Sequence, residues 1–213
     1  MLRRLLLLVL ALATSIPAAA GDATPLDRFL DGLQTWRGDF QQVVLDARGK
    51  AVEQGSGRLL VQRPGKFRWE YTPANVGADA GQLLVADGRN LWFYDRDLAQ
   101  VTVKPVSEAL SSTPIVLLSG DAAALRAAFD IATAPRRDNL DWVIVQPRNA
   151  AADFSRAELA FRGNALARMV ISDKLGQTVT LQFSRPARNA TLNAEELGFK
   201  APPGVDVIGT VQP

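Results

Sequence analysis

Hydrophobic and polar residues alternate along most of the chain after residue 37, with the period of two that is typical of β-strands. The pattern predicts strands at about 38–46, 56–63, 66–71, 82–87, 90–95, 98–104, 129–133, 140–146, 156–162, 165–172 and 177–184. Turns at Arg48-Gly49, Pro64-Gly65, Asp87-Gly88 and Gly163-Asn164 are short, so we expect neighbouring strands to be antiparallel. The segment 72–81 is interpreted as a longer polar loop, and the tail 196–209 as mostly irregular.

Helical patterns interrupt this alternation at two places. At the first, Thr24 can cap a helix that starts at Pro25, with Asp27 answering the cap and an apolar stripe formed by Leu26, Phe29, Leu30 and Leu33. At the second, residues 107–130 show no alternation. Pro114 can begin a short helix that Gly120 ends, and Asp121 can cap a second helix to about residue 128.

These elements predict one mainly β domain with helices, residues 21–213. We expect an unclosed, strongly curved antiparallel β-barrel of about eleven strands covered by a helical lid, because a sheet of that length curls and its concave face needs a cover. The lid segment consists of Pro114, Ile115, Val116, Leu117 and Leu118. Its plain interpretation is a helix that seals the core. Short helices broken by Pro and Gly also shift at low cost, and a movable lid over an apolar concavity provides a site for an apolar ligand.

One arginine stands in line with an apolar strand face. Arg63 shares its parity with Leu59 and Val61. It either extends its charged end into water at the end of the strand or donates hydrogen bonds to carbonyls at a helix end of the lid. Several aromatic residues are candidates for the wall of the concavity, although each is more often plain core: Phe40, Phe67, Trp69, Trp92 and Phe183.

The first twenty residues have the three parts of a secretory signal: Arg3 and Arg4, a short apolar run, and three alanines before Gly21. An uncleaved membrane anchor is the alternative, which the shortness of the run disfavours. Removal of residues 1–20 takes two of the 24 basic residues and leaves 22 basic and 22 acidic ones. A neutral chain without a polybasic cluster is a poor candidate for binding nucleic acid or anionic lipid.

The chain contains neither cysteine nor histidine. This composition excludes Ser-His-Asp and Cys-His catalysis, removes the commonest zinc ligands, and leaves no cysteine for lipid attachment. A hydrolase that uses two carboxylates is a remaining possibility, but Asp87, Asp95 and Asp97 sit in or beside turns, where Asp usually makes local hydrogen bonds. We therefore predict no enzymatic activity, no metal site and no cofactor.

Five stretches resemble the periplasmic outer-membrane lipoprotein carrier family, LolA, in the same order along the chain. They are GDFQQ (38–42), the glycine-to-tryptophan pattern at 57–69, VADGRNLWFYDRDLAQ (85–100), SSTPIVLL (111–118) and GFKAPPGVDV (198–207). The resemblance implies a monomeric periplasmic carrier with an eleven-stranded unclosed barrel, whose cavity holds the acyl chains of lipoproteins. It also implies a donor, the inner-membrane ABC transporter complex, and an acceptor, an outer-membrane lipoprotein receptor.

The resemblance also implies roles for single residues. Arg63 matches the arginine that holds the family's lid closed, Phe67 and Trp69 match apolar positions of the same hairpin, and Ile115–Leu118 match the lid helix. The loop 72–81 is longer than the family's usual connection. The absence of cysteine favours the soluble carrier over the receptor, which is itself a lipoprotein. A periplasmic sensor or scavenger that binds free lipid or another hydrophobic small molecule is the alternative function.

Overall fold

The computed structural model describes residues 23–77, 80–106, 114–120, 122–150 and 152–212. The expected signal peptide at 1–20 and the expected cap Asp121 lie outside the described residues. Within the described chain, the first helix, α1 (Pro25–Leu30), begins as predicted. The Asp27 amide donates to the Thr24 hydroxyl at 3.2 Å, and the Thr24 amide donates to the Asp27 carboxylate at 2.8 Å.

Eleven antiparallel strands of the described chain pair into one sheet, which confirms the predicted fold class. They are β1 (Thr35–Leu45), β2 (Ala51–Gln62), β3 (Lys66–Pro73), β4 (Gln82–Ala86), β5 (Asn90–Asp95), β6 (Gln100–Pro105), β7 (Phe129–Arg137), β8 (Leu140–Pro147), β9 (Phe154–Arg162), β10 (Ala165–Asp173) and β11 (Thr178–Arg188). Their order is β6-β5-β4-β3-β2-β1-β11-β10-β9-β8-β7. Strand β7 does not pair with the other end of this sheet, so the barrel stays open.

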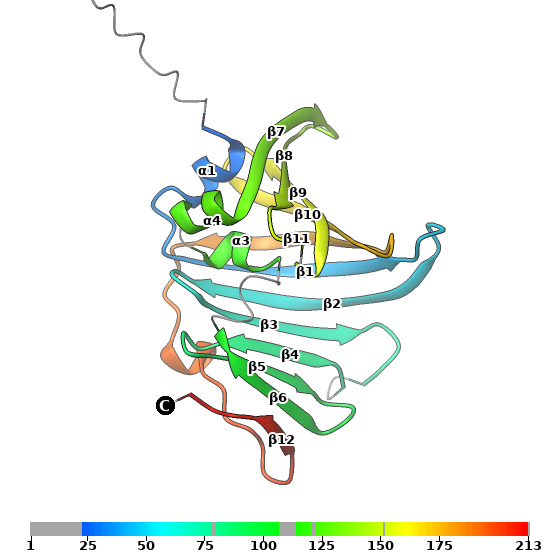
Figure 1. Cartoon of the computed structure of the whole chain (residues 1–213), viewed down its shortest axis with the longest axis vertical. Coiled ribbons are helices and arrows are strands. Elements are labelled where there is room, and N and C mark those ends of the chain that lie inside the picture. The colour runs from blue at the N-terminus through cyan, green and yellow to red at the C-terminus, as the bar shows by residue number, and fades with distance from the viewer. Residues whose placement is uncertain (1–22, 78–79, 107–113, 121, 151, 213) are drawn as a thin grey trace, which may run out of the picture.

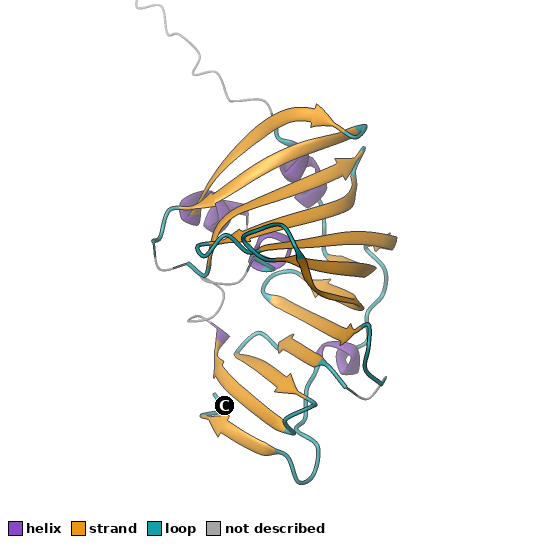
Figure 2. Cartoon of the chain, turned by 90° about the vertical axis from the view of Figure 1, so that its right-hand side faces the viewer, coloured by secondary structure: helices purple, strands orange, loops and turns teal. Residues whose placement is uncertain are grey.

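The sheet curls around three helices (Figures 1 and 2). Helix α1, helix α3 (Val116–Ser119) and helix α4 (Ala122–Ala128) lie on its inner side, where they contact β8, β2 and β7. The principal hydrophobic core lies between the helices and the inner face of the sheet. The described part of the insert predicted between residues 107 and 130, residues 114–120 and 122–128, therefore covers the concave face, as expected for a sheet that does not close.

The C-terminal tail is more ordered than the sequence predicted. It forms a 3₁₀ helix, η1 (Ala194–Leu197), and a twelfth strand, β12 (Asp206–Gly209), which pairs in parallel with β6. The prediction of a mostly irregular tail was wrong at these two places. A four-residue parallel strand has no adjacent hairpin to signal it, because its partner lies about a hundred residues earlier in the chain.

Trp92 faces the outer side of the sheet, so its assignment to the inner cavity was wrong. Its ring packs against Phe199 of the C-terminal segment at 5.4 Å between centroids, and its indole N–H donates to Asp87 at 2.7 Å. The alternation of β5 turns Leu91 and Phe93 inward instead. The C-terminal segment buries the outer face of β4–β6, so both faces of β5 are apolar. The sequence pattern therefore could not show which face Trp92 occupies.

Asp87 has a structural role in the turn before β5, as its place in the sequence predicted. Its carboxylate accepts hydrogen bonds from the amides of Arg89 and Asn90 as well as from Trp92. Burial by itself raises the pKa of the Asp87 carboxyl, but these donors outweigh burial and hold the pKa below its ordinary value.

The buried Asn90 side chain attaches the end of the chain to the sheet. Its amide nitrogen donates to the carbonyl of Gln212 at 3.1 Å, and its amide oxygen accepts from the Gln212 backbone N–H at 2.8 Å.

We predict that Asn90→Ala speeds amide hydrogen exchange at Val211 and Gln212 about tenfold, because two hydrogen bonds to a partly buried backbone are lost. Asn75→Ala, in an exposed loop, is the matched control. Unchanged exchange in Asn90→Ala would show that this clamp does not hold the tail.

Candidate functional site

Four of the five aromatic residues predicted to line the concavity lie together on the inner face. Phe40 on β1 pairs with Phe183 on β11, and their ring centroids are 6.3 Å apart. Trp69 on β3 lies against Phe40 at 4.6 Å, and Phe67 belongs to the same buried cluster. Three strands thus present a continuous aromatic wall to the helices. Contact between this wall and a bound ligand stays a prediction.

Gly57 makes room for this wall. It pairs with Phe40 across β1 and β2, and a Cβ atom at residue 57 would lie 2.5 Å from the Phe40 ring. The ring therefore lies directly against the glycine, an arrangement that any larger residue would prevent. This close approach gives a physical reason for the glycine at the start of the 57–69 pattern.

The lid segment fills the space in front of the aromatic wall. Ile115, Leu117 and Leu118 are each no more than 3% exposed, and Val116 packs against the same core. Helix α3 has only four residues and ends at Gly120, so few backbone hydrogen bonds of its own hold it together. Burial and contacts with the sheet therefore dominate its attachment.

An apolar pocket of about 180 Å³ remains beside the lid segment. Its walls come from β3–β5 on one side, from β10 on the other, and from the start of the lid: Trp69, Gln82, Leu84, Phe93, Pro114, Ile115, Met169 and Ile171. Phe93 is 37% exposed there, an unusual value for an inward-facing aromatic residue. This part of the inner face is covered only in part, and it is suited to an apolar ligand.

Arg63 joins two helix ends to the sheet. Its Nη1 donates to the carbonyl of Leu30, the last residue of α1, at 2.8 Å. Its Nη2 and Nε donate to the carbonyl of Gly120, at the end of α3, at 2.8 and 3.2 Å. A cation suits this position because helix C-termini carry unpaired carbonyls and a partial negative charge. The side chain does not simply extend into water at the strand's end.

The turn after Arg63 adds a backbone contact to the same helix. The Gly65 amide donates to the carbonyl of Ser119 at 2.8 Å. The β2–β3 hairpin therefore supplies donors to two consecutive carbonyls, those of Ser119 and Gly120, where α3 ends. Because these bonds depend on the position of α3, they can exist only while the helix lies against the sheet.

A second arginine, which the sequence reasoning missed, holds α1. Arg188 at the end of β11 donates to the carbonyls of Phe29 and Asp31, and its guanidinium lies 6.0 Å from the centre of the Phe29 ring. The strand pairing shifts between Arg37 and Asp39, and Arg185 has a φ of +49° at this bulge. This shift turns Arg188 toward the inner face. Simple alternation along β11 from the inward-facing Phe183 would place Arg188 on the outer face instead.

An ion pair connects helix α4 to α1. Arg126 on α4 contacts the Asp27 carboxylate at 2.5 Å. Burial by itself raises the pKa of Asp27, but the hydrogen bonds from Thr24 and the charge of Arg126 outweigh it and leave the pKa below its ordinary value. The same carboxylate thus caps α1 and holds α4.

Within the described part of the chain, no helix is both long and apolar enough to cross a bilayer. The described Asp and Glu side chains form no group of three or more that could hold a metal ion.

The chain is similar over most of its length to proteins of one family. Residues 31–200 match the family described as outer membrane lipoprotein carrier protein LolA. A protein of that name from Methylobacillus flagellatus is 37% identical over 202 residues, which span 95% of this chain and 96% of the relative. Another, from Chromobacterium violaceum, is 38% identical over 199 residues, 93% of either chain.

A solved structure shares the fold. An uncharacterized conserved protein from Thermus thermophilus superposes with a TM-score of 0.53 at 16% identity, over 86% of this chain and 96% of that one. At this identity the likeness concerns the fold alone.

The lowered pKa of Asp27 predicts how acid acts on the helical cover. A carboxylate whose folded pKa lies below its unfolded value of about 3.9 stabilises the fold above that value, and the stabilisation is lost as the pH falls through the folded pKa. We predict that Asp27→Asn lowers the free energy of unfolding by about 1 kcal/mol at neutral pH. Below about pH 4 the wild type should lose stability more steeply than Asp27→Asn. Denaturant titrations across this range measure both, and equal slopes would contradict the assignment.

Proposed function

Because the chain belongs to the outer membrane lipoprotein carrier (LolA) family, we propose that it binds the acyl chains of lipoproteins and carries them between membranes. One observation carries the proposal. An aromatic inner sheet face is covered by a short apolar helix, with a small apolar pocket at its edge. This arrangement suits a ligand that is apolar, flexible and bound for a limited time. Nothing in the proposal requires an enzymatic step.

The cost of exposing acyl chains to water explains why a carrier is needed. Burial of a methylene group contributes about 0.8 kcal/mol, so a chain of about 16 carbons costs on the order of 10 kcal/mol to expose. Unassisted transfer through an aqueous compartment is therefore extremely slow. A carrier overcomes this barrier only if its own apolar surface replaces the membrane.

The lid segment makes such a replacement reversible. The pocket of about 180 Å³ is smaller than the roughly 300–1,000 Å³ of common ligand sites, so acyl chains need α3 to leave the inner face. Burial of Ile115, Leu117 and Leu118 contributes about 1.5–3 kcal/mol for each side chain. Their sum, about 4.5–9 kcal/mol, is smaller than the transfer energy of one acyl chain but of the same order. Chain and lid thus compete for the same surface with energies of similar magnitude.

Arg63 favours the empty, closed state in this competition. Its bonds to Gly120 break when α3 moves, so they stabilise only the closed form. We place the cycle in the periplasm, with an inner-membrane ABC transporter complex as donor and an outer-membrane receptor as acceptor. In this scheme the return of Arg63 to the helix end drives cargo out toward the acceptor.

Release of lipoprotein from a membrane tests the function directly. Purified protein without residues 1–20 should release an acylated lipoprotein from vesicles that contain the donor complex. Mass spectrometry of the loaded protein should then find intact lipoprotein. Recovery of free lipid without lipoprotein would favour a sensor or scavenger, and failure to release any lipoprotein would refute the carrier function.

The same assay tests Arg63. We predict that Arg63→Leu accepts cargo as well as the wild type but passes at least tenfold less of it to the acceptor, because charge-assisted bonds of about 1.5–3 kcal/mol no longer favour closure. Arg188→Leu, which also removes an inward arginine bonded to helix carbonyls but not to α3, is the matched control and should deliver cargo normally. Normal delivery by Arg63→Leu would exclude the proposed latch.

A further inference from the structure

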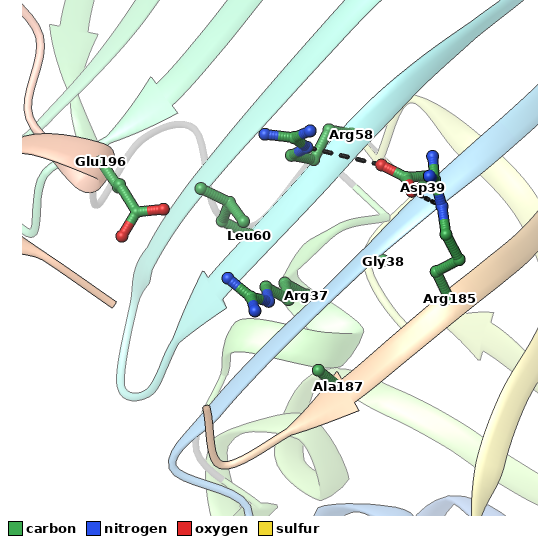
Figure 3. Close-up of a pocket in the computed structure, with 8 residues that line it drawn as sticks. All are labelled: Arg37, Gly38, Asp39, Arg58, Leu60, Arg185, Ala187 and Glu196. Atoms are coloured by element: carbon green, nitrogen blue, oxygen red, sulfur yellow. Dashed lines mark hydrogen bonds and ion pairs between the residues drawn. The ribbon is translucent and has the colours of Figure 1, made fainter. Parts of the chain in front are cut away.

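The outer face of the central strands carries a group of arginines far from the lid. Arg37 on β1, Arg58 on β2 and Arg185 on β11 line a pocket of about 350 Å³, drawn in Figure 3. Alternation along β1 and β2 places Arg37 and Arg58 behind the aromatic wall, and the bulge in β11 turns Arg185 to the same outer face. A molecule bound here would leave the inner face free.

Asp39 holds two of the three arginines in place. Its two carboxylate oxygens contact Arg58 at 3.4 Å and Arg185 at 2.5 Å, as the dashed lines of Figure 3 indicate. The bulge at Arg185, with φ +49°, lets that side chain reach across to β1. Both guanidiniums remain exposed, at 61% and 81% of their side-chain surface, so they keep donors for a further anion.

Arg37 is left without a partner within the described chain. Leu60 and Ala187 flank it on the neighbouring strands, and neither can neutralise it. The carboxylate of Glu196 on η1, which also lines the pocket, accepts a hydrogen bond from the Asn193 amide at 2.7 Å in a capping box. The pocket therefore combines an unpaired cation with two oriented ones.

A second hollow extends this pocket along the sheet. It has a volume of about 400 Å³, shares Asp39, Arg58 and Arg185 with the first, and is otherwise lined mainly by hydroxyl and amide side chains. Together the two hollows form a shallow polar groove across β11, β1, β2 and β3, which we name the outer groove. Its length suits an extended peptide better than a single small ion.

We propose that the outer groove binds an extended acidic segment of a partner protein. Arginine guanidiniums match carboxylates in shape and charge, and the hydroxyl and amide groups between them can bond a peptide backbone. An anionic bilayer fits less well, because Asp39, Glu70 and Glu196 lie among the arginines and would repel a continuous negative surface. A peptide can place its carboxylates beside the arginines only.

This inference builds on the proposed carrier function, since a partner on the outer groove could hold the protein while cargo passes through the inner face. The two claims can still fail separately. Acidic-peptide binding needs no acyl chain, and release of lipoprotein from vesicles needs no acidic peptide.

Fluorescence anisotropy with a labelled peptide of alternating Glu and Ser tests the site, with a Gln and Ser peptide as control. Only the acidic peptide should bind, and its affinity should fall as salt rises. Arg37→Gln should weaken binding about fivefold, the size expected for one exposed ion pair. Arg48→Gln removes the same positive charge from the exposed β1–β2 turn and should leave the affinity for the acidic peptide unchanged.

Four results would overturn the proposal. The first two are equal binding of both peptides and equal loss of affinity in the two variants. The third is a set of NMR amide chemical-shift changes, recorded on addition of the acidic peptide, that maps to the inner face rather than to β1, β2 and β11. The fourth is binding of phosphatidylglycerol vesicles without binding of the peptide. Lipoprotein release by Arg37→Gln from vesicles that contain the donor should stay normal if the groove acts separately from acyl-chain binding.

Discussion

An open sheet with an apolar inner face cannot leave that face in water, and the rest of this structure follows from that constraint. Eleven antiparallel strands curl without closing, so helices must complete the core. The covering helices are short, and α3 has only four residues. Their ends would leave many carbonyls unpaired, and Arg63 and Arg188 supply donors from the sheet.

Short covering helices have a functional consequence. A long helix with its own hydrogen bonds would close the cavity permanently. The lid segment and α3 depend instead on the buried side chains of Ile115, Leu117 and Leu118 and on bonds from the β2–β3 hairpin. The cover can therefore be replaced by another apolar group of similar size. Binding and release of acyl chains then become two directions of one exchange, which a carrier requires and a storage protein does not.

The sequence predicted the parts of this design that follow a regular period. Strand alternation placed Phe40, Phe67, Trp69 and Arg63 on the inner face, and capping chemistry located α1. Features that break the period were missed. The bulge at Arg185 reversed the parity that would have revealed Arg188, and the parallel strand β12 and the tail over Trp92 depend on contacts distant in sequence. Alternation cannot report such long-range packing.

Cargo and α3 compete for the inner face, and amide hydrogen exchange of the helix measures this competition directly. The amides of Ser119 and Gly120 bond to carbonyls within the lid and should be protected in the empty protein. Loading with an acylated lipoprotein should speed their exchange at least tenfold while the strands β1–β3 stay protected. Unchanged or slower exchange at these amides in the fully loaded protein would contradict the account.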